Sequence, residues 1–316
     1  MNHIPIKTIS KNSSIFPGFF LAKSGIRFRN SFGKSQLISG FGFNDSKEAA
    51  INSSRFEAFE HLHATYDFQK ETIQKNKTFN GIKLKDPNIL RAFPPSSILI
   101  GLVPDAIGPS TDANGLGCHV VYEKAVHHAL FETLERDCLA KLWYGLLKVV
   151  QIEDTSFSIG DFRIRFFTLE SLSLPFAIAI IDNRNEGIWA VGSALRYSIS
   201  SALQHAQHEA MMLIESSFIE NGVSYSAEIE HRILSLRDQA ISEIREVFFN
   251  SKISGYIKMS ALPSMQSINF EVFEDIWVVD LCKNDELCVV KVLCPQMQNP
   301  RWHREKNLGV PYDPFC

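Results

Sequence analysis

The most informative part of the sequence runs from residue 114 to residue 137 and reads NGLGCHVVYEKAVHHALFETLERD. Its start is rich in glycine and is typical of a turn, while its later apolar residues recur at helical spacing. The spacing predicts a helix over about residues 121–149. His128, Glu132 and Glu135 fall at positions i, i+4 and i+7, so they share one face of that helix.

An earlier segment carries the same arrangement. Asp45 is an acceptable N-cap for a helix whose apolar residues continue to about residue 66. Within this helix, Ser53, Glu57 and Glu60 again fall at positions i, i+4 and i+7. Two carboxylates one turn apart repel each other by roughly 0.2–0.5 kcal/mol on an exposed helix, and by more when they are buried. A bound cation removes that repulsion.

The two pairs of glutamates predict a shared Mg²⁺ site, because Mg²⁺ prefers oxygen ligands and bridges phosphate oxygens. The predicted ligands are Glu57, Glu60, Glu132 and Glu135. A solvated acidic face is the alternative explanation of both pairs. Glu60 and His63 also have the Glu-x-x-His spacing of di-iron carboxylate bundles, but Cys138 stands where the second helix needs its histidine. The turn that contains Asn114 is either a phosphate-binding loop or an ordinary turn.

The composition excludes several classes of protein. The chain has 316 residues, 45% apolar and 21% charged, which rules out a disordered chain, a collagen-like fibre and a simple coiled coil. Its net charge of −3 gives no sign of a nucleic acid or an anionic membrane as partner. No run of residues is long and apolar enough for a membrane span. The six cysteines form no CxxC pair and follow no signal peptide, so we expect reduced thiols in a cytoplasmic protein.

The rest of the chain mixes predicted strands and helices. Strands are expected within residues 1–44, within 161–191 and in two runs near 276–294, and helices over 198–219 and 226–248. The connection over residues 67–110 is expected to be rich in loops and to contain one or two strands. Neither a linker nor an internal repeat is evident, so we expect an α+β (mixed α/β) fold. It would form one domain over residues 1–316, in which the long helices that carry Glu-x-x-Glu pack on mixed sheets.

Four blocks of this sequence resemble the YcaO family of ATP-dependent enzymes, which activate peptide backbone amides. The blocks follow one another from about residue 40 to residue 296. The first contains Ser53, Glu57 and Glu60, and the second is the turn over residues 111–117 with the following Glu132, Glu135, Arg136 and Asp137. The third contains Ala202, Leu203, Ala206, Glu209 and Ala210, and the fourth is the strand over residues 289–295.

The resemblance implies roles for individual residues. The four glutamates named above would hold Mg²⁺. The residues that would contact the nucleotide are Ser53, Asn114, Glu123, His128, Arg136 and Glu209. The tail over residues 309–316 is similar to the proline-rich terminus of azoline-forming members. Pro314 and Cys316 would be its catalytic residues, and the terminal carboxylate of Cys316 would help to move protons. An exposed tail without a catalytic role is the alternative.

The implied reaction is an ATP-dependent cyclodehydration of Cys, Ser or Thr in a ribosomally synthesised peptide. It gives thiazoline or oxazoline rings, as in the maturation of bacteriocins. Thioamide or amidine formation and a non-catalytic ATP-binding accessory subunit are the alternatives. The implied cofactors are ATP and Mg²⁺. The implied partners are a precursor peptide, an E1-like or ocin-ThiF-like protein that binds its leader, a dehydrogenase and further copies of the chain, but no nucleic acid and no membrane.

Overall fold

The computed structural model describes residues 5–30, 33–100, 113–171, 174–183, 185–218, 246–247, 249–262 and 275–295. The chain divides into two compact units. The first consists of Met1–Asn12, Phe19–Thr133 and Asn269–Met297, and the second of Ser13–Gly18, Leu134–Ile268 and Gln298–Cys316. The predicted helix over residues 226–248 lies outside the described residues except for 246–247, and the tail over 309–316 lies outside them entirely.

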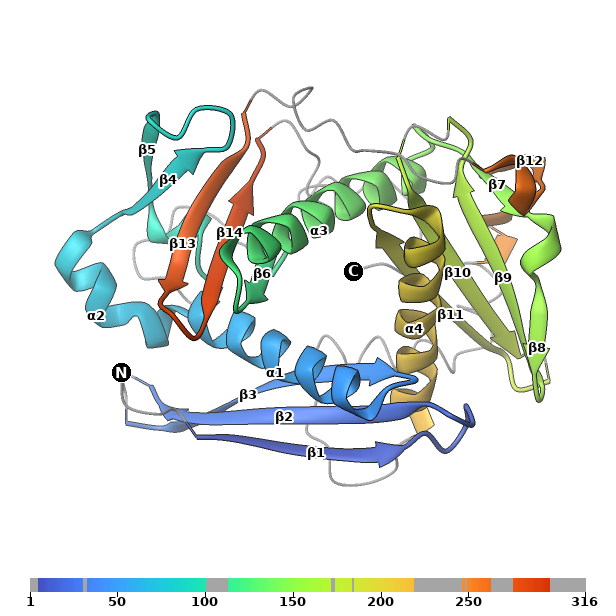
Figure 1. Cartoon of the computed structure of the whole chain (residues 1–316), viewed down its shortest axis with the longest axis horizontal. Helices are drawn as coiled ribbons and strands as arrows, with labels where there is room; N and C mark the ends of the chain where they lie inside the picture. The colour runs from blue at the N-terminus through green and yellow to red at the C-terminus, as the bar shows by residue number, and fades with distance from the viewer. Residues whose placement is uncertain are drawn as a thin grey trace. The chain divides into compact units, whose positions relative to one another are not determined.

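The first unit contains two antiparallel sheets. The smaller sheet has the order β1-β2-β3, with β1 at Ile6–Asn12, β2 at Phe20–Arg29 and β3 at Ser35–Asn44. The helix α1 (Lys47–Ala64) packs along this sheet (Figure 1). The larger sheet has the order β5-β4-β13-β14-β6. Its strands are β4 (Phe79–Lys83), β5 (Leu90–Phe93), β6 (Leu116–His119), β13 (Trp277–Lys283) and β14 (Cys288–Leu293).

The second unit is built on one mixed sheet with the order β11-β10-β9-β7-β12, and β8 also pairs with β9. Its strands are β7 (Val149–Ile152), β8 (Phe157–Ile159), β9 (Phe162–Leu169), β10 (Phe176–Asn183), β11 (Ile188–Leu195) and β12 (Ile253–Ile257). Only the pair of β7 with β12 is parallel among the strand pairs of this sheet that the structure describes. Every residue of β10 and β11 is buried, which explains their continuous apolar sequences. The helix α4 (Ile199–Phe218) covers one face of these strands.

Two more helices and three 3₁₀ turns have bounds within the described residues. The long helix α3 (Tyr122–Trp143) contributes residues up to Thr133 to the first unit and residues from Leu134 to the second. The others are α2 (Tyr66–Asn76) and the turns Pro95–Ser97, Glu153–Thr155 and Met259–Ala261. Helices and strands thus occur together as expected, and the α+β fold is confirmed. The single domain over residues 1–316 stays a prediction.

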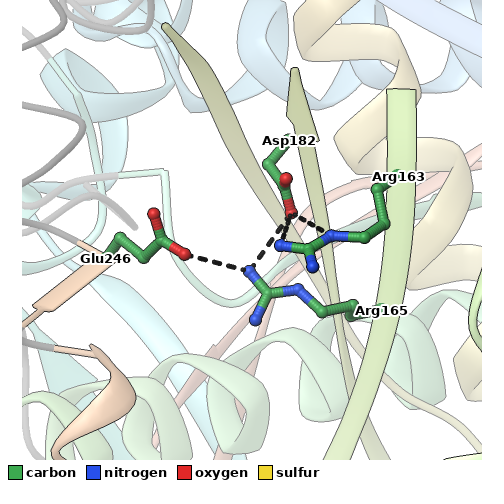
Figure 2. Close-up of polar contacts among 4 residues, drawn as sticks. All are labelled: Arg163, Arg165, Asp182 and Glu246. Carbon is green, nitrogen blue, oxygen red and sulfur yellow. Dashed lines mark hydrogen bonds and ion pairs between the residues drawn. The ribbon is translucent and has the colours of Figure 1, made fainter. Parts of the chain in front are cut away.

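A network of charges lies in the sheet of the second unit. Arg163 and Arg165 of β9 converge on one carboxylate oxygen of Asp182 in β10, at 3.1 and 3.2 Å (Figure 2). Arg165 also lies 3.6 Å from the carboxylate of Glu246. Burial lowers the pKa of Arg165 below its usual value, and Asp182 opposes that change. Because Asp182 and Arg165 are both buried, each depends on the other for its charge to be tolerated.

Three local predictions were wrong. Ser46, and not Asp45, is the N-cap of α1, because its side chain accepts a hydrogen bond from the backbone N–H of Ala49. The helix that carries Glu132 ends at Trp143 and not at residue 149 as predicted. Residue 149 is instead the first residue of β7.

Residues 66–76 form α2 instead of the expected loop. Tyr66, Phe68 and Ile73 of this helix pack on core clusters of the first unit but are only partly buried, and Gln69 is its one buried residue. The Gln69 amide donates to the backbone oxygens of His63 and Leu281, at 2.9 and 3.1 Å. Polar tertiary contacts therefore add to the apolar ones, and a search for apolar periodicity does not detect them.

Candidate functional site

Glu57 is positioned by a close approach between α1 and β3, an edge strand of its sheet. A Cβ atom on Gly40 would lie 2.3 Å from the backbone oxygen of Ser54, and one on Gly42 would lie 2.0 Å from another backbone oxygen of α1. Any larger residue at either position would force the helix away from the strand. With glycine there, the Glu57 carboxylate accepts a hydrogen bond of 2.9 Å from the backbone N–H of Phe41.

Glu132 is positioned in the same way by α3 and β6, which is also an edge strand. A Cβ atom on Gly117 would lie 2.2 Å from a backbone oxygen of α3. Gly115 has a φ of +76°, and a Cβ atom there would lie 2.5 Å from the backbone oxygen of Val292. The Glu132 carboxylate accepts a hydrogen bond of 3.1 Å from the backbone N–H of Gly115. The glycine-rich turn predicted from the sequence thus holds a carboxylate.

Glu209 shows the arrangement a third time, in the second unit. A Cβ atom on Gly192 of the edge strand β11 would lie 2.1 Å from the backbone oxygen of Ala206 in α4. The Glu209 carboxylate accepts a hydrogen bond of 2.6 Å from the backbone N–H of Ser193. Charge-assisted hydrogen bonds of this kind are about twice as strong as neutral ones, so each carboxylate is held firmly.

The three copies amount to an internal repeat, which corrects the prediction that the chain has none. In every copy an edge strand leads directly into a helix that folds back on it, and the glutamate follows a glycine by 17 residues. The pairs are Gly40 with Glu57, Gly115 with Glu132 and Gly192 with Glu209. Three residues further on stand Glu60, Glu135 and Met212, so the third copy lacks the second carboxylate. One glycine and one glutamate among unlike residues are too few to reveal a repeat by sequence alone.

Glu60 is the buried member of its pair. Burial raises the pKa of its carboxyl well above the usual value, and the charges of Glu132 and Glu57 raise it further. Its Oε1 atom is buried and accepts no hydrogen bond from the part of the chain that the structure describes. The Nδ1 atom of His128 lies 3.6 Å from that oxygen. A carboxylate oxygen without a donor, beside two more carboxylates, fits a bound cation such as Mg²⁺.

Glu135 and Glu209 lie in the second unit and share one residue, Ser193. The Ser193 hydroxyl donates to Oε1 of Glu135 at 2.6 Å, while its backbone N–H donates to Glu209. Burial raises the pKa of Glu135, although Arg136 acts in the opposite direction. Arg136 also lies 4.0 Å from Oε1 of Glu209. Sequence reasoning missed Ser193, whose one local signal is that it follows Gly192.

The predicted site residues fall into two groups. Those in the first unit are Ser53, Glu57, Glu60, Asn114, Glu123, His128 and Glu132, and those in the second are Glu135, Arg136 and Glu209. Their convergence on one pocket stays a prediction. Among the described residues, no group of three or more His, Cys, Asp and Glu side chains is arranged to hold a metal ion. Pro314 and Cys316 lie outside the described residues, as do Thr111 and Asp112 of the turn.

Solvent exposure differs between the predicted site residues and their neighbours on the same helices. Ser53 and Glu123 are exposed. The neighbouring Ser54 is fully buried and hydrogen-bonded through its hydroxyl to Ser24, at 2.8 Å. His63 is a packing residue, since its ring meets Phe68 edge-on at 5.0 Å and burial lowers its pKa to about 4. This packing role leaves the di-iron alternative without its histidine.

Two further predictions concern cysteines and membranes. The described cysteines are all buried, and no disulfide joins one of them to another; they are Cys118, Cys138, Cys282, Cys288 and Cys294. This agrees with the reduced thiols expected from the sequence. No helix in the described part of the chain has the length and apolar character needed to cross a membrane.

Comparison with known proteins supplies independent findings. A family model described as the ATP- and Mg²⁺-binding YcaO cyclodehydratase matches residues 104–298. No curated protein matches the chain in sequence. A structure of YcaO from Methanopyrus kandleri bound with AMPPCP and Mg²⁺ is similar in fold, with a TM-score of 0.66 and 15% identity over 95% of this chain and 87% of that one.

Two other solved structures share the fold. The Escherichia coli microcin synthetase McbBCD complex contains a chain with a TM-score of 0.63 and 13% identity, over 92% of this chain and 88% of that one. A heterocyclase in complex with substrate and cofactor has a TM-score of 0.68 and 14% identity, over 93% of this chain and 50% of that one. At such low identities these structures establish the fold and nothing further.

Proposed function

Since the chain belongs to the YcaO family of ATP- and Mg²⁺-binding cyclodehydratases, we propose that it uses ATP to activate backbone amides of a peptide. The proposed product class within that chemistry is the thiazoline or oxazoline ring, formed from Cys, Ser or Thr. The observation that carries the proposal is the buried Glu60 carboxylate, whose Oε1 accepts no hydrogen bond from the described residues. The pKa of Glu60 is raised by burial and by its acidic neighbours, which is the environment that a bound cation relieves.

The proposed reaction begins when a substrate side chain attacks the preceding backbone carbonyl. The oxyanion that forms takes the γ-phosphoryl group of ATP, and phosphate then leaves with the former carbonyl oxygen. The role of the protein is to orient the two substrates and to stabilise developing charge. Bound Mg²⁺ supplies neutralisation of the triphosphate charge.

The residues proposed to hold Mg²⁺ are Glu57, Glu60, Glu132 and Glu135. The residues proposed to contact the nucleotide are Ser53, Asn114, Glu123, His128, Arg136 and Glu209. The repeated strand–helix contact supports these roles, because it ties one oxygen of Glu57, Glu132 and Glu209 to a backbone N–H. Carboxylates fixed in advance need little reorganisation when the metal and the nucleotide bind.

The proposed partners are a precursor peptide and a protein that delivers it, of the E1-like or ocin-ThiF-like kind. Among structures of this fold, one heterocyclase was solved with its substrate and another chain belongs to a microcin synthetase complex, which supports partners of this class. A dehydrogenase that oxidises the rings and self-association of the chain are further proposals. A catalytic role of Pro314 and Cys316 of the tail, with proton transfer by the terminal carboxylate of Cys316, is proposed on the resemblance alone.

Titration calorimetry with Mg-ATP tests the metal site. Glu60→Gln keeps the size of the side chain but removes its charge, so we expect affinity to fall by at least about tenfold, which is about 1.4 kcal/mol. Glu48→Gln is the matched control, because Glu48 lies exposed in the first turn of the same helix. Equal affinity of the two variants and the unchanged protein would rule out a role for Glu60.

The chemistry is tested with a precursor peptide, its delivery protein and Mg-ATP. We expect each modified residue to lose the mass of one water and to consume one ATP. A heavy oxygen isotope placed in the substrate amide should appear in the released phosphate. Loss of water without that transfer contradicts amide phosphorylation. A product in which sulfur or an amine has replaced the amide oxygen indicates thioamide or amidine formation, and ATP binding without turnover indicates an accessory subunit.

A further inference from the structure

The sheet β1-β2-β3 has two faces of opposite character. Directly paired residues of an antiparallel sheet lie on the same face. Thr8 pairs with Ser24 and the two hydroxyls are 2.9 Å apart, while the Ser24 hydroxyl lies 2.8 Å from that of Ser54 in α1. These residues and their alternate neighbours along each strand therefore face α1. The residues between them form the other face, which we name the open face.

The open face is basic and partly apolar. Its charged residues are Lys7, Lys11, Lys23, Arg27 and Arg29, and its exposed apolar residues are Ile9 and Leu37. Ile9 is 59% exposed and Leu37 is 46% exposed, although both lie within regular strands. The first 44 residues of the chain contain six Lys and Arg and no Asp or Glu, whereas the whole chain has a net charge of −3. Positive charge is thus concentrated on one face of one sheet.

The strand register spaces these side chains regularly. Lys7 is opposite Gly25, Lys23 is opposite Ile9, and Arg27 is opposite Leu37. Each of these cations therefore has an uncharged partner on the neighbouring strand, which limits repulsion within the sheet. Cations and uncharged side chains therefore alternate along β1 and face one another across the strands, while Arg27 and Arg29 are successive cations on the open face of β2. An occupant of matching character carries acidic and apolar side chains in alternation.

The edge of β1 gives the direction in which such an occupant would extend the sheet. β1 pairs with β2 on one side and with no strand on the other in the described part of the chain. Lysines on an edge strand can simply prevent aggregation. That explanation covers Lys7 but not Arg27 and Arg29, which lie on the central strand β2. It also leaves the exposure of Ile9 and Leu37 unexplained.

We propose that the edge of β1 and the open face bind an extended acidic segment of a peptide or protein partner. The segment adds as a fourth strand, with main-chain hydrogen bonds to β1. Its residues on the open face then lie beside Lys7, Ile9 and Lys11, so they follow the order acidic, any, apolar, any, acidic. Charge complementarity fixes the register of the segment and speeds its association. This binding surface is independent of the proposed reaction with ATP.

Fluorescence anisotropy tests the proposal with the full chain and a labelled peptide of sequence Ser-Glu-Ser-Val-Ser-Glu-Ser. We expect binding that weakens as ionic strength rises, because the contacts are exposed. The double variant Lys7→Glu, Arg27→Glu should weaken binding at least about tenfold. Lys34→Glu is the control, since it makes one of these charge reversals outside the strands and should leave binding within about twofold. Mg-ATP affinity should be the same in all three proteins.

Several results would overturn the proposal. One is a peptide affinity that does not differ between the double variant and the Lys34→Glu control, and another is the absence of binding to the unchanged chain. Equal binding of the peptide Ser-Glu-Glu-Val-Ser-Ser-Ser, in which the acids are adjacent, would rule out the alternating register. Tighter binding of a single-stranded oligonucleotide or of phosphatidylserine vesicles, lost in the double variant, would assign the open face to nucleic acid or membrane instead. A failure of the ATP reaction alone leaves these results unaffected.

Discussion

Replacing Gly192 by alanine tests the idea that glycine lets a helix lie directly on an edge strand. The added Cβ atom would lie 2.1 Å from the backbone oxygen of Ala206 and 2.5 Å from the backbone nitrogen of Ala210. Normal contact between such atoms begins near about 3.5 Å, so α4 must move away by more than about 1 Å. The contact involves backbone atoms, and no change of rotamer relieves it.

The expected cost has two parts. Overpacking of a buried contact costs about 1–3 kcal/mol. The same movement stretches the hydrogen bond of 2.6 Å between Ser193 and Glu209, and the loss of a hydrogen bond to a charged group costs about 1.5–3 kcal/mol. We therefore expect Gly192→Ala to destabilise the second unit by at least about 3 kcal/mol. Gly→Ala at an unstrained position stabilises a protein by about 0.4–1 kcal/mol. A loss of stability in Gly192→Ala would therefore by itself indicate the close contact.

Urea unfolding measures this difference, and Gly255→Ala is the matched control. Gly255 lies in β12 of the same sheet, and a Cβ atom there would meet nothing within 4 Å. The control should stay within about 0.5 kcal/mol of the unchanged protein. If Gly192→Ala unfolds at the same urea concentration as Gly255→Ala, the close approach of α4 to β11 is not what fixes Glu209.

Three further substitutions test other contacts. Asp182→Asn should destabilise by about 3–5 kcal/mol because it leaves the buried Arg165 with Glu246 as its acidic partner in place of the closer, buried Asp182, whereas Arg163→Ala removes a more exposed partner and should cost less than about 1 kcal/mol in the same urea experiment. Burial raises the pKa of Glu215, but hydrogen bonds from residues 13–15 outweigh this and lower it below 4.5, so its contribution to stability is present above pH 4.5 and is lost as pH falls. Thermal unfolding from pH 6 to pH 3 should show a steeper loss for the unchanged protein than for Glu215→Gln, and parallel curves would contradict this assignment. Ser193→Ala should cost about 1.5–3 kcal/mol of stability, because the hydrogen bond of its hydroxyl to the buried Glu135 is lost, and should weaken Mg-ATP binding, with recovery of both in Ser193→Thr; unchanged affinity in the alanine variant would show that this hydroxyl does not position the site.

Most elements of the fold follow from local patterns in the sequence. Strands that are buried on both faces, such as β10 and β11, have continuous apolar sequences that a local reading detects. The two Glu-x-x-Glu helices were likewise predicted, because charged pairs inside apolar runs are conspicuous at helical spacing. The end of α3 was misplaced because an apolar sequence continues past Trp143 into β7. Apolar content alone does not distinguish a helix from the strand that follows it.

The residues of the candidate site could be predicted in part. Glu57, Glu60 and Glu132 were named from their spacing, and their charges do act on one another within the first unit. Ser193 could not be named, because its role depends on β11 bringing its hydroxyl and its N–H to two glutamates that lie 58 and 16 residues away along the chain. No short-range pattern records contacts of that length.

Residue spacing along single helices thus determined which carboxylates share a face, and this needed no knowledge of the fold. Tertiary structure decided how firmly each carboxylate is held and how far it is buried. The reason is that the hydrogen bonds to Glu57, Glu132 and Glu209 come from edge strands, whose unpaired N–H groups exist only after the sheets have formed. Glycine at the contact then permits the helix to approach, and this depends on a neighbour that is distant along the chain.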